Sequence, residues 1–361
     1  MLATVTAAEP ALFRAYPALR GRIPHRAFLA GPTPVDAVPL AGLPEGVLYV
    51  KRDERACPLY GGNKPRKLEF VIGHALARGA RRLVTTGGIG TNHGLATTVL
   101  GRAAGLEASL VLLHQPVTDE VRAKLLCAAA WGAELVYGRN VPGVALATAW
   151  VLARSAARGE RPHLVPTGGS SPRGNAGFVS AGLELAEQVA AGLLPEPAQL
   201  FVPVGTGGTL AGLVAGLRLG GLGTRVVGVL VTDILPPSPR SLLRAARTSL
   251  ARLRRLDPAI PETALGPGDF ELVTDQLGPG YGAATPAARE AVAAAAALGL
   301  ALETTYTGKC LAALRARAAA RALGPGPVLF WNTYNAVDAA AAAPRRPDPA
   351  LLPAALRRLV G

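Results

Sequence analysis

Lysine is scarce in this chain of 361 residues, although basic residues are not. Only five of the 38 basic residues are lysine, and two of these, Lys64 and Lys67, lie in one short stretch, "YGGNKPRKLEF" (60–70). The arginines are scattered among Ala, Gly and Pro, a pattern typical of base-composition drift. A chain so poor in lysine that retains two here raises the question of what Lys64 does that an arginine cannot.

Cysteine is also scarce. Cys57, Cys127 and Cys310 lie far apart and show neither a Cys-x-x-Cys motif nor a Cys/His spacing suited to a metal. The sequence lacks an uninterrupted apolar run of about 18 residues, the length that a membrane-spanning helix requires. Its first twenty residues lack the basic start and apolar core of a signal peptide. We therefore expect a cytoplasmic, metal-free protein with no membrane partner.

Acidic residues are outnumbered, which gives a formal net charge of +14. A charge of this size invites a nucleic-acid or anionic-surface interpretation. The basic residues are dispersed, however, and the same excess follows from arginine-rich composition alone. We expect no nucleic-acid partner, while attraction of anionic substrates stays open.

Short runs rich in β-branched residues alternate with alanine- and leucine-rich runs long enough for helices. Continuous apolar strands separated by helices are typical of an α/β protein whose parallel sheet is covered on both faces. The predicted strands are 47–53, 81–88, 108–113, 134–138, 163–169, 200–208, 225–233, 270–275 and 328–333. Helices are predicted over 66–79 and 175–192, with a helical excursion in 234–268 and a low-complexity, peripheral stretch at 336–361.

Three predicted strands end in glycine pairs that precede a helix: "TTGGIGTNHG", "PTGGSSPRGN" and "PVGTGGTLAG". Such corners at the carboxyl edge of a parallel sheet are where ligands bind, so we expect one shared site. In the third, Gly205, Gly207 and Gly208 allow the backbone to approach a ligand, while Thr206 and Thr209 add hydroxyl groups.

The third corner predicts a phosphate-binding loop at the start of a helix. It is not a Walker loop, because no Gly-Lys-Ser/Thr follows. A dinucleotide fingerprint is the alternative; Asp233 at the end of the next strand favours it, whereas Leu210 in place of a small residue does not.

Lys64 follows two glycines and an asparagine and precedes Pro65, a favoured first-turn helix residue. An ammonium group at a helix start opposes the helix dipole, and burial lowers its pKa further. A neutral amine can form an imine, which arginine cannot. An imine-forming lysine and a phosphate loop together predict pyridoxal 5′-phosphate (PLP) as cofactor, with Asn92 at its phenolic oxygen and Thr307 at its pyridine nitrogen.

Seven stretches in family order resemble the fold-type II PLP enzymes, within the group that contains 1-aminocyclopropane-1-carboxylate (ACC) deaminase and D-cysteine desulfhydrase. They are "GPTPV" (31–35), "VKRDERACPLYGGNKPRKLEF" (50–70), "LVTTGGIGTNHGLATT" (83–98), "TGGSSPRGNAGFV" (167–179), "VGTGGTLAGL" (204–213), "GPGYG" (278–282) and "TYTGKCLAAL" (305–314). The resemblance implies a two-domain α/β fold like that of the tryptophan synthase β subunit. It further implies a large PLP-binding domain of residues 1–66 and 175–361, a small inserted domain of 67–174, and a homodimer.

The resemblance also implies roles for individual residues. Lys64 would hold PLP as a Schiff base, Asn92 would contact it, and Gly205 through Thr209 would bind its phosphate. Thr91, Tyr281 and Tyr306 match catalytic positions, and Lys67 and Lys309 either support the site or lie on helix surfaces. The residues expected to contact a small amino-acid substrate are Thr91, Asn92, His93 and Thr333.

Position 307 favours one reaction of the group. ACC deaminases resemble one another in having glutamate there, which would protonate the pyridine; the neutral hydroxyl of Thr307 suits α,β-elimination instead, where a leaving group takes the electrons. Thr333 is likewise typical of desulfhydrases. Gly90-Thr91 in place of Gln-Ser, and Tyr334-Asn335 in place of two glycines, depart from the family pattern and leave another substrate open.

Other functions stay open at this stage. They are ACC deaminase-type ring opening, a non-catalytic PLP-binding protein, and a nucleotide-dependent oxidoreductase that uses residues 205–212 and Asp233.

Overall fold

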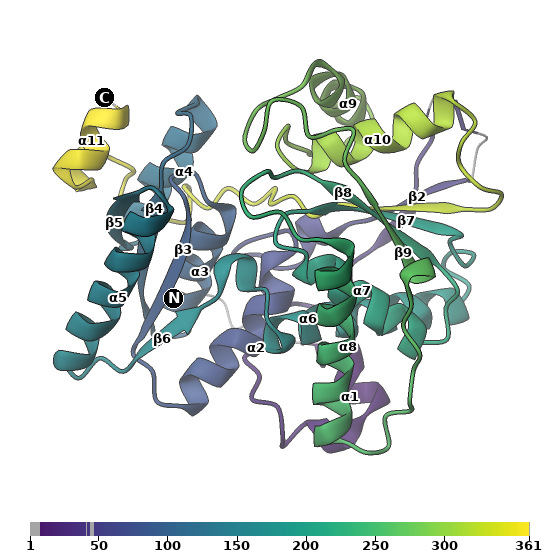
Figure 1. Cartoon of the computed structure of the whole chain (residues 1–361), viewed down its shortest axis with the longest axis horizontal. Coiled ribbons are helices and arrows are strands. Elements are labelled where there is room, and N and C mark those ends of the chain that lie inside the picture. The colour runs from purple at the N-terminus through teal and green to yellow at the C-terminus, as the bar shows by residue number, and fades with distance from the viewer. Residues whose placement is uncertain (1–7, 41, 44–46, 361) are drawn as a thin grey trace.

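Ten strands form two separate sheets in the computed structural model, which describes residues 8–40, 42–43 and 47–360 (Figure 1). Residues 1–7 lie outside the described residues. They are the start of the predicted large domain and part of the first twenty residues, which lack signal-peptide features. None of the helices among those described is both long enough and apolar enough to cross a bilayer.

The larger sheet has six strands in the order β1-β2-β10-β7-β8-β9. These are β1 (Val35–Ala37), β2 (Leu48–Lys51), β10 (Val328–Trp331), β7 (Gln199–Val204), β8 (Arg225–Leu230) and β9 (Phe270–Val273). All neighbours are parallel except β1, which pairs antiparallel with β2 at the edge. The nine predicted strand regions are all strands, whereas the three-residue β1 was not predicted.

The smaller sheet has four parallel strands in the order β5-β4-β3-β6. They are β5 (Glu134–Arg139), β4 (Glu107–Leu113), β3 (Arg82–Gly88) and β6 (Pro162–Val165). Both sheets are covered by helices on both faces, so their central strands are largely buried. The predicted α/β class with parallel sheets is therefore correct.

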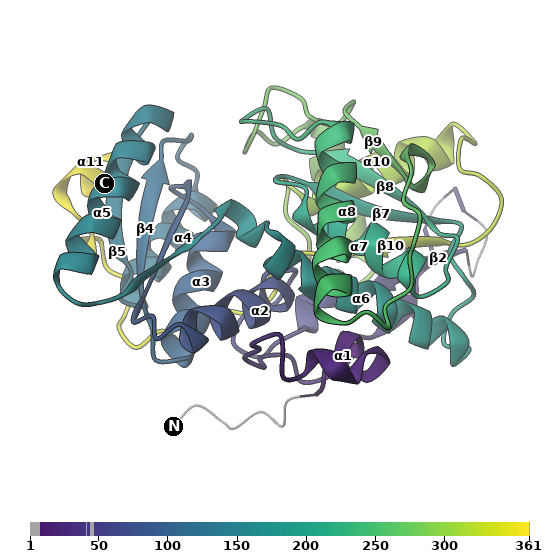
Figure 2. The ribbon, with the colours of Figure 1, turned by 60° about the horizontal axis from the view of Figure 1, so that its bottom comes forward.

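Helices on the two faces of the six-stranded sheet enclose two apolar clusters. One face carries α1 (Ala11–Ala15), α6 (Pro172–Ala190), α7 (Gly208–Leu219) and α8 (Pro239–Leu256), and the other α9 (Pro286–Ala296) and α10 (Thr307–Ala319). The helical excursion expected in 234–268 is α8. The four-stranded sheet packs against α2 (Lys64–Ala77), α3 (Asn92–Ala103) and α4 (Asp119–Ala130) on one face and α5 (Val141–Ala157) on the other. Figure 2 shows the two sheets as separate lobes joined along α2 and α6.

Short 3-10 helices complete the structure. They are η1 (Pro17–Leu19), η2 (Asp53–Arg55), η3 (Thr167–Gly169), η4 (Pro267–Asp269) and η5 (Pro349–Leu351).

A buried network of charged side chains fixes the start of α2 against the six-stranded sheet. Arg66 donates to Asp53 and Glu184, each at 2.8 Å, and Lys51 Nζ lies 2.5 Å from Glu184 Oε1. The indole of Trp331 donates to Asp53 at 2.7 Å. Since the four charged side chains satisfy one another, the network holds β2, α2 and α6 in one arrangement.

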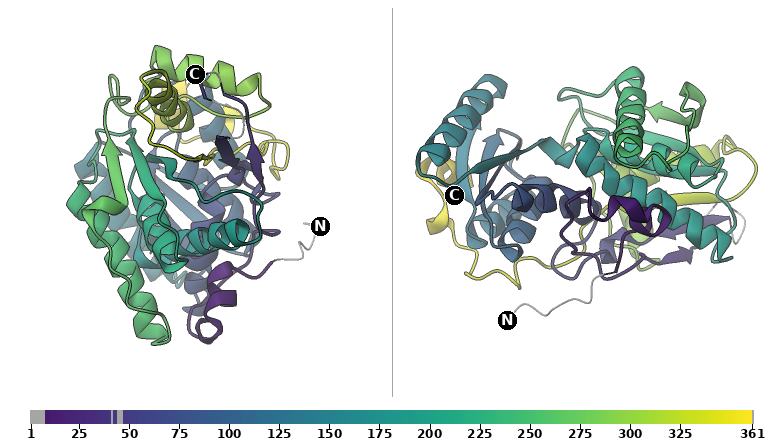
Figure 3. Two further views of the ribbon diagram at one scale, coloured as in Figure 1. Left: turned by 90° about the vertical axis from the view of Figure 1, so that its right-hand side faces the viewer. Right: turned by 90° about the horizontal axis from the view of Figure 1, so that it is seen from below.

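The C-terminal segment ends on the lobe of the four-stranded sheet. Leu352 and, on α11 (Ala354–Val360), Leu356 and Val360 are buried in the apolar cluster of that sheet, and Trp131 Nε1 donates to the Ala339 carbonyl at 2.7 Å. Figure 3 shows the C-terminal end of the described chain on the lobe of the four-stranded sheet, away from the six-stranded sheet. The sequence predicts this segment as a peripheral part of the large domain; its apolar residues instead spread along α11 and complete the core of the other lobe.

Candidate active site

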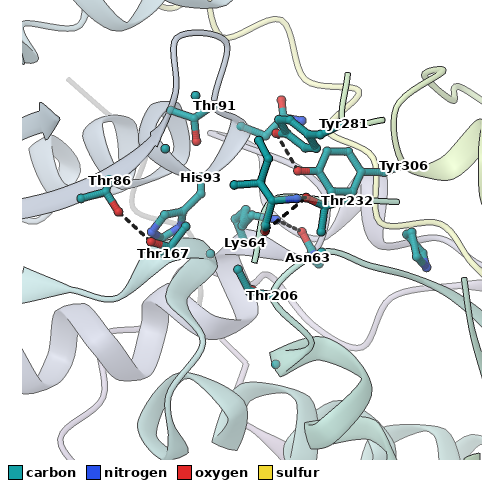
Figure 4. Close-up of a pocket in the computed structure, with 18 of the residues that line it drawn as sticks. Asn63, Lys64, Thr86, Thr91, His93, Thr167, Thr206, Thr232, Tyr281 and Tyr306 are labelled. Carbon is teal, nitrogen blue, oxygen red and sulfur yellow. Dashed lines mark hydrogen bonds between the residues drawn. The ribbon is translucent and has the colours of Figure 1, made fainter. Parts of the chain in front are cut away.

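A cavity of about 310 Å³ lies where the two sheets meet, within the usual size range of small-molecule sites of roughly 300–1,000 Å³. Its wall contains every predicted site residue except Thr307. Figure 4 shows Lys64, Thr91, Tyr281 and Tyr306 around the same space. Residues far apart in sequence therefore form one site, as the three glycine corners predict.

The three corners contact one another directly. Thr86, at the end of β3, lies 2.6 Å from Thr167 after β6, measured between the two hydroxyl oxygens. Ser170, in the same corner as Thr167, lies 2.6 Å from the Thr206 hydroxyl oxygen after β7. Since β3 and β6 belong to one sheet and β7 to the other, these contacts bridge the two lobes at the cavity.

Lys64 is the first residue of α2 and lies in the cavity wall. Gly61 and Gly62 allow the approach: a Cβ on Gly61 would lie 2.3 Å from the Glu54 carbonyl oxygen, and Gly62 has a φ of +77°. The Lys64 ammonium donates to Asn63 Oδ1 at 2.7 Å. Burial lowers the pKa of Lys64 to about 8, so a larger fraction of this amine is neutral near neutral pH than of an ordinary lysine.

Lys67 lies one turn further along α2, buried beneath the glycine corners. Its Nζ donates to the Gly168 carbonyl and to Ser170 Oγ, both at 3.2 Å. Burial, and the neighbouring charge of Lys64, hold the pKa of Lys67 well below its usual value. Through Ser170 and Thr206 this side chain connects to the predicted phosphate loop, which places it in the site rather than on a helix surface.

Residues Gly205 to Thr209 comprise the loop after β7 and the first two residues of α7, and all five line the cavity. Gly207 is the N-cap of α7 and has a φ of +82°, which a residue with a side chain rarely adopts. The N-terminal N–H groups of α7 therefore border the cavity, and Asn63 Nδ2 donates to Thr209 Oγ1 at 3.2 Å. A helix start of this kind binds a phosphate through backbone N–H groups and the helix dipole.

Thr91 is the N-cap of α3, and its Oγ1 accepts a hydrogen bond from Gly94 N at 3.1 Å. The hydroxyl proton is not used in that bond and is available to the cavity. A Cβ on Gly94 would lie 2.4 Å from the Thr91 methyl carbon, so the methyl group packs over Gly94. Asn92 follows as the first residue of α3 and also lines the cavity.

His93 is buried in the cavity wall as a neutral imidazole. Thr85 Oγ1 donates to the Val165 carbonyl at 2.8 Å and thus accepts from His93 Nε2 at 3.0 Å. His93 Nδ1 is then a bare acceptor, and it has no partner among the residues that the structure describes. Burial, with the charges of Lys64 and Lys67, holds the pKa of His93 well below its usual value. Such an orphaned buried acceptor suits a ligand that donates a hydrogen bond.

Tyr281 and Tyr306 form a pair at the cavity wall. Tyr306 donates to the Tyr281 hydroxyl oxygen at 2.8 Å, and the ring centroids are 5.9 Å apart, edge to face. Burial raises the pKa of both phenols, that of Tyr306 well above its usual value. Both groups therefore stay protonated, and Tyr281 keeps a proton that it can donate into the cavity.

Thr307 is placed differently from the other predicted residues. It is fully buried behind the cavity wall, and its Oγ1 accepts from Glu303 N at 3.0 Å while lying 3.2 Å from Glu303 Oε1. Glu303, which the sequence interpretation did not single out, lines the cavity in its place. Its carboxylate accepts from the backbone N–H groups of Thr305, Tyr306 and Thr307 and so caps α10. A pyridine contact by Thr307 stays a prediction.

The segment 333–335 closes another side of the cavity. Asn335 Oδ1 accepts from Gly61 N at 2.6 Å, so this departure from the family pattern supports the loop that leads to Lys64. Gly62 lies against the Thr333 carbonyl, where a Cβ would come within 2.5 Å of the oxygen. Tyr334 adds bulk to the wall where a glycine would leave space.

These groups fit PLP. A partly neutral amine, a helix start lined by glycines for a phosphate, and the orphaned His93 acceptor all border one cavity. Asp233, the residue that would favour a nucleotide, instead accepts a hydrogen bond from Tyr281 N at 2.9 Å.

Comparison with known proteins gives the same answer. Residues 27–333 match the family model described as "Pyridoxal-phosphate dependent enzyme". D-cysteine desulfhydrase of Salmonella paratyphi A is 32% identical over 327 residues, which cover 87% of this chain and 95% of the relative. The D-cysteine desulfhydrase of Salmonella paratyphi C is 33% identical over 330 residues, with the same shares covered.

Two solved structures are similar. The crystal structure of an ACC deaminase homologue, 28% identical, has a TM-score of 0.75 and covers 91% of this chain and 96% of its own. The crystal structure of a T.th. threonine deaminase, 20% identical with a TM-score of 0.60 and covering 91% of this chain and 98% of its own, supports the fold alone. The predicted family, fold class and cofactor are confirmed. The chain belongs to the pyridoxal-phosphate dependent enzymes, in the family of D-cysteine desulfhydrase and ACC deaminase.

Proposed function

We propose that this enzyme carries out α,β-elimination on a small amino acid of the D-cysteine type, giving pyruvate, ammonia and sulfide. The main support is the presence of two complementary groups in one cavity. Lys64 is an amine with a pKa of about 8, suited to accept a proton, and Tyr281 is a phenol that stays protonated and has a proton to donate.

Bound PLP supplies the electron sink that makes a proton on the substrate's Cα removable. The Gly205–Thr209 loop would bind its phosphate, and Asn92 would contact its ring oxygen. Lys64 removes the α-proton, the Cβ–S bond breaks with its electron pair going to sulfur, and Tyr281 protonates the leaving thiolate. The resulting 2-aminoacrylate reacts with water to give pyruvate and ammonia, so that atoms and charge balance.

Thr91, Asn92, His93 and Thr333 are proposed to hold the substrate. The Thr91 hydroxyl proton and the N-terminal N–H groups of α3 can bind a carboxylate, since α3 begins at Asn92 beside the cavity. The neutral His93 offers an acceptor without adding charge. These contacts orient Cα toward Lys64 and exclude water from part of the cavity.

The preference for elimination over ring opening rests on the predicted contact of the uncharged Thr307 with the pyridine nitrogen. Its hydroxyl is hydrogen-bonded to Glu303, whose carboxylate is itself held by three backbone N–H groups. Because the Glu303 carboxylate already caps α10, it is a poorer partner for a pyridine nitrogen than a glutamate side chain with no other hydrogen bonds. ACC deaminase-type ring opening is the second candidate, and the departure from the family pattern at Tyr334 and Asn335 leaves another amino-acid substrate as a further one.

Several predictions from the sequence belong to the same proposal. The domain boundaries at 66/67 and 174/175, a cytoplasmic location and a homodimer are expected of the enzyme. The predicted small amino-acid substrate is supported by the relatives' names, D-cysteine desulfhydrase and ACC deaminase.

The test is an absorption spectrum of the purified protein with PLP, recorded before and after addition of D-cysteine, with pyruvate and sulfide assayed in the same sample. We expect a visible band for the lysine-bound cofactor, a shift on addition of substrate, and both products. Lys64→Ala should lose the band of the lysine-bound cofactor while the protein stays folded.

Each outcome separates one alternative. Pyruvate from ACC but not from D-cysteine would replace elimination by ring opening. A spectral shift with no product from any amino acid would support a PLP-binding protein without catalysis. An unchanged band in Lys64→Ala would refute the assignment of the lysine.

A further inference from the structure

Lys309 is fully buried on α10, although a lysine on a helix is usually exposed. Its Nζ donates to the backbone carbonyl of Leu277 at 2.7 Å and to that of Gly280 at 3.1 Å. Both carbonyls belong to the loop that carries Tyr281. Among the residues that the structure describes, no carboxylate lies within ion-pair distance of Lys309, so its hydrogen bonds go to this loop alone.

Asp233 holds the same loop from the end of β8. Its Oδ1 accepts from Tyr281 N at 2.9 Å. Gly280 has a φ of +135°, and a Cβ placed on it would lie 2.9 Å from Asp233 Oδ2. Gly280 therefore lets the loop pass close to the carboxylate. The loop is held by the ammonium of Lys309 and by the carboxylate of Asp233.

The surroundings of Lys309 resemble a site for a monovalent cation. A buried ammonium is costly to remove from water unless oxygen atoms replace its hydration. Here neutral backbone carbonyls do so, as they would for a bound ion, and burial lowers the pKa of Lys309 while the charges of Glu303 and Asp233 oppose that change. Moving the carbonyls away would leave a buried charge without partners, so the ammonium opposes displacement of the loop.

We propose that Lys309 is a positioning residue, whose ammonium acts as a cation tethered to α10 and holds the loop Leu277–Tyr281 in place. With Asp233 it fixes the backbone of Tyr281, so that the phenol meets Tyr306 and points into the cavity. The effect on the loop is independent of the reaction. Its catalytic importance rests on the proposed function.

The first measurement is hydrogen–deuterium exchange of the peptide that contains residues 277–283. Lys309→Met keeps the stem of the side chain and removes the charge, and Lys309→Ala also leaves space for a small amine. We expect faster exchange in this peptide for both variants, and slower exchange again when methylammonium or ethylammonium is added to Lys309→Ala. Cys310→Ala is the matched control, because Cys310 is equally buried on the same helix and does not bind the loop. In this variant the peptide with residues 277–283 should exchange as in the unmodified protein.

Asp233→Ala separates the two contacts. It should also speed exchange at residue 281, but added amines should not reverse the effect, since the ammonium is still present. Unchanged exchange in both Lys309 variants, or a change equal to that in Cys310→Ala, would overturn the proposal. If added amines do not slow exchange in Lys309→Ala, the ammonium of Lys309 does not act as a tethered cation.

Kinetics supply the functional reading. A displaced phenol should reduce kcat by up to about 100-fold, since small misplacements of a reacting group have effects of this size, with KM changed little and partial rescue by amines. Faster exchange together with unchanged kcat would show that the loop is held by Lys309 but that Tyr281 is not the acid. Failure of the proposed function is thus distinguished from failure of the proposal about Lys309.

Discussion

The hydroxyl of Tyr306 donates a hydrogen bond of 2.8 Å to the hydroxyl of Tyr281, and not the reverse. This direction gives the two phenols different roles. Tyr306 has used its proton within the pair, whereas Tyr281 has its own proton available and its oxygen is supported by a donor. Support of this kind stabilises the phenolate that forms when Tyr281 gives up a proton.

Substitution of the two tyrosines should therefore be unequal. Tyr281→Phe removes the acid and should lower the rate of elimination by about 10²- to 10⁴-fold, the usual contribution of general acid catalysis. Tyr306→Phe removes one supporting hydrogen bond, worth about 0.5–1.5 kcal/mol, and should cost about 2- to 13-fold. Measurement of kcat for a β-substituted alanine with a good leaving group should show a smaller effect of Tyr281→Phe. Equal losses in the two variants would contradict these roles.

The pKa of Lys64 predicts how the apoenzyme takes up its cofactor with pH. Only the neutral amine attacks an aldehyde, so below the pKa the rate should rise tenfold per pH unit, and above it the rate should be constant. Because burial lowers the pKa of Lys64 to about 8, the bend should lie near pH 8. Stopped-flow absorbance of apoenzyme mixed with PLP measures this rate. A bend near the ordinary lysine value of about 10.4 would show that the amine is not buried as described.

Glu303→Gln should move this bend to lower pH. The Glu303 carboxylate raises the pKa of Lys64 and partly opposes the effect of burial, so removing its charge lowers that pKa further. The same variant weakens the cap of α10 and should reduce the free energy of unfolding by about 0.5–2 kcal/mol. Glu262→Gln is the control, since its side chain is 86% exposed, and it should leave both quantities unchanged. A bend that stays in place in Glu303→Gln would exclude the electrostatic coupling.

Glu184 offers a prediction for stability. Burial raises its pKa, but Arg66 and Lys51 outweigh burial and hold the pKa at about 2. Glu184→Ala leaves two buried cations with too few partners and should lower the free energy of unfolding by about 3–5 kcal/mol. Glu187→Ala on the same helix removes an exposed ion pair with Arg14 and should cost less than about 1 kcal/mol.

Denaturant unfolding measures both variants, and pH adds a second test for Glu184. Its folded pKa is depressed, so its contribution is present above the unfolded pKa and disappears as pH falls through about 2. The difference between Glu184→Ala and the unmodified protein should therefore shrink in acid. A difference that is small at neutral pH would mean that the network relaxes around the lost carboxylate.

The parts of the structure that sequence predicts are those with local causes. Continuous apolar runs between helices identify buried parallel strands, and the glycines around Lys64 and Gly207 identify places where backbone and ligand approach closely. The edge strand β1 was missed because two half-buried residues and one exposed residue form no apolar run, and it exists only because β2 offers a free edge.

The site residues that sequence misjudges depend on tertiary contacts or on helix ends. Lys309 contacts carbonyls from residues 277 and 280, which no local pattern reveals. Glu303 does have a local signal in the sequence. An acidic residue just before the start of a helix can accept hydrogen bonds from the free N–H groups of the first turn. The Glu303 carboxylate also accepts a hydrogen bond from the hydroxyl of Thr307, for which the sequence predicts only a contact with the cofactor.

The end of the chain completes a core that its first half begins. The four strands of the smaller sheet lie between residues 82 and 165, but Leu352, Leu356 and Val360 enter its apolar cluster from the last residues described. During synthesis this lobe therefore presents an uncovered apolar surface near Trp131 and α4 until residues 352–360 have been made. A chain truncated before Leu352 would keep every cavity residue but would leave this lobe with an exposed apolar surface, which favours chaperone binding or aggregation.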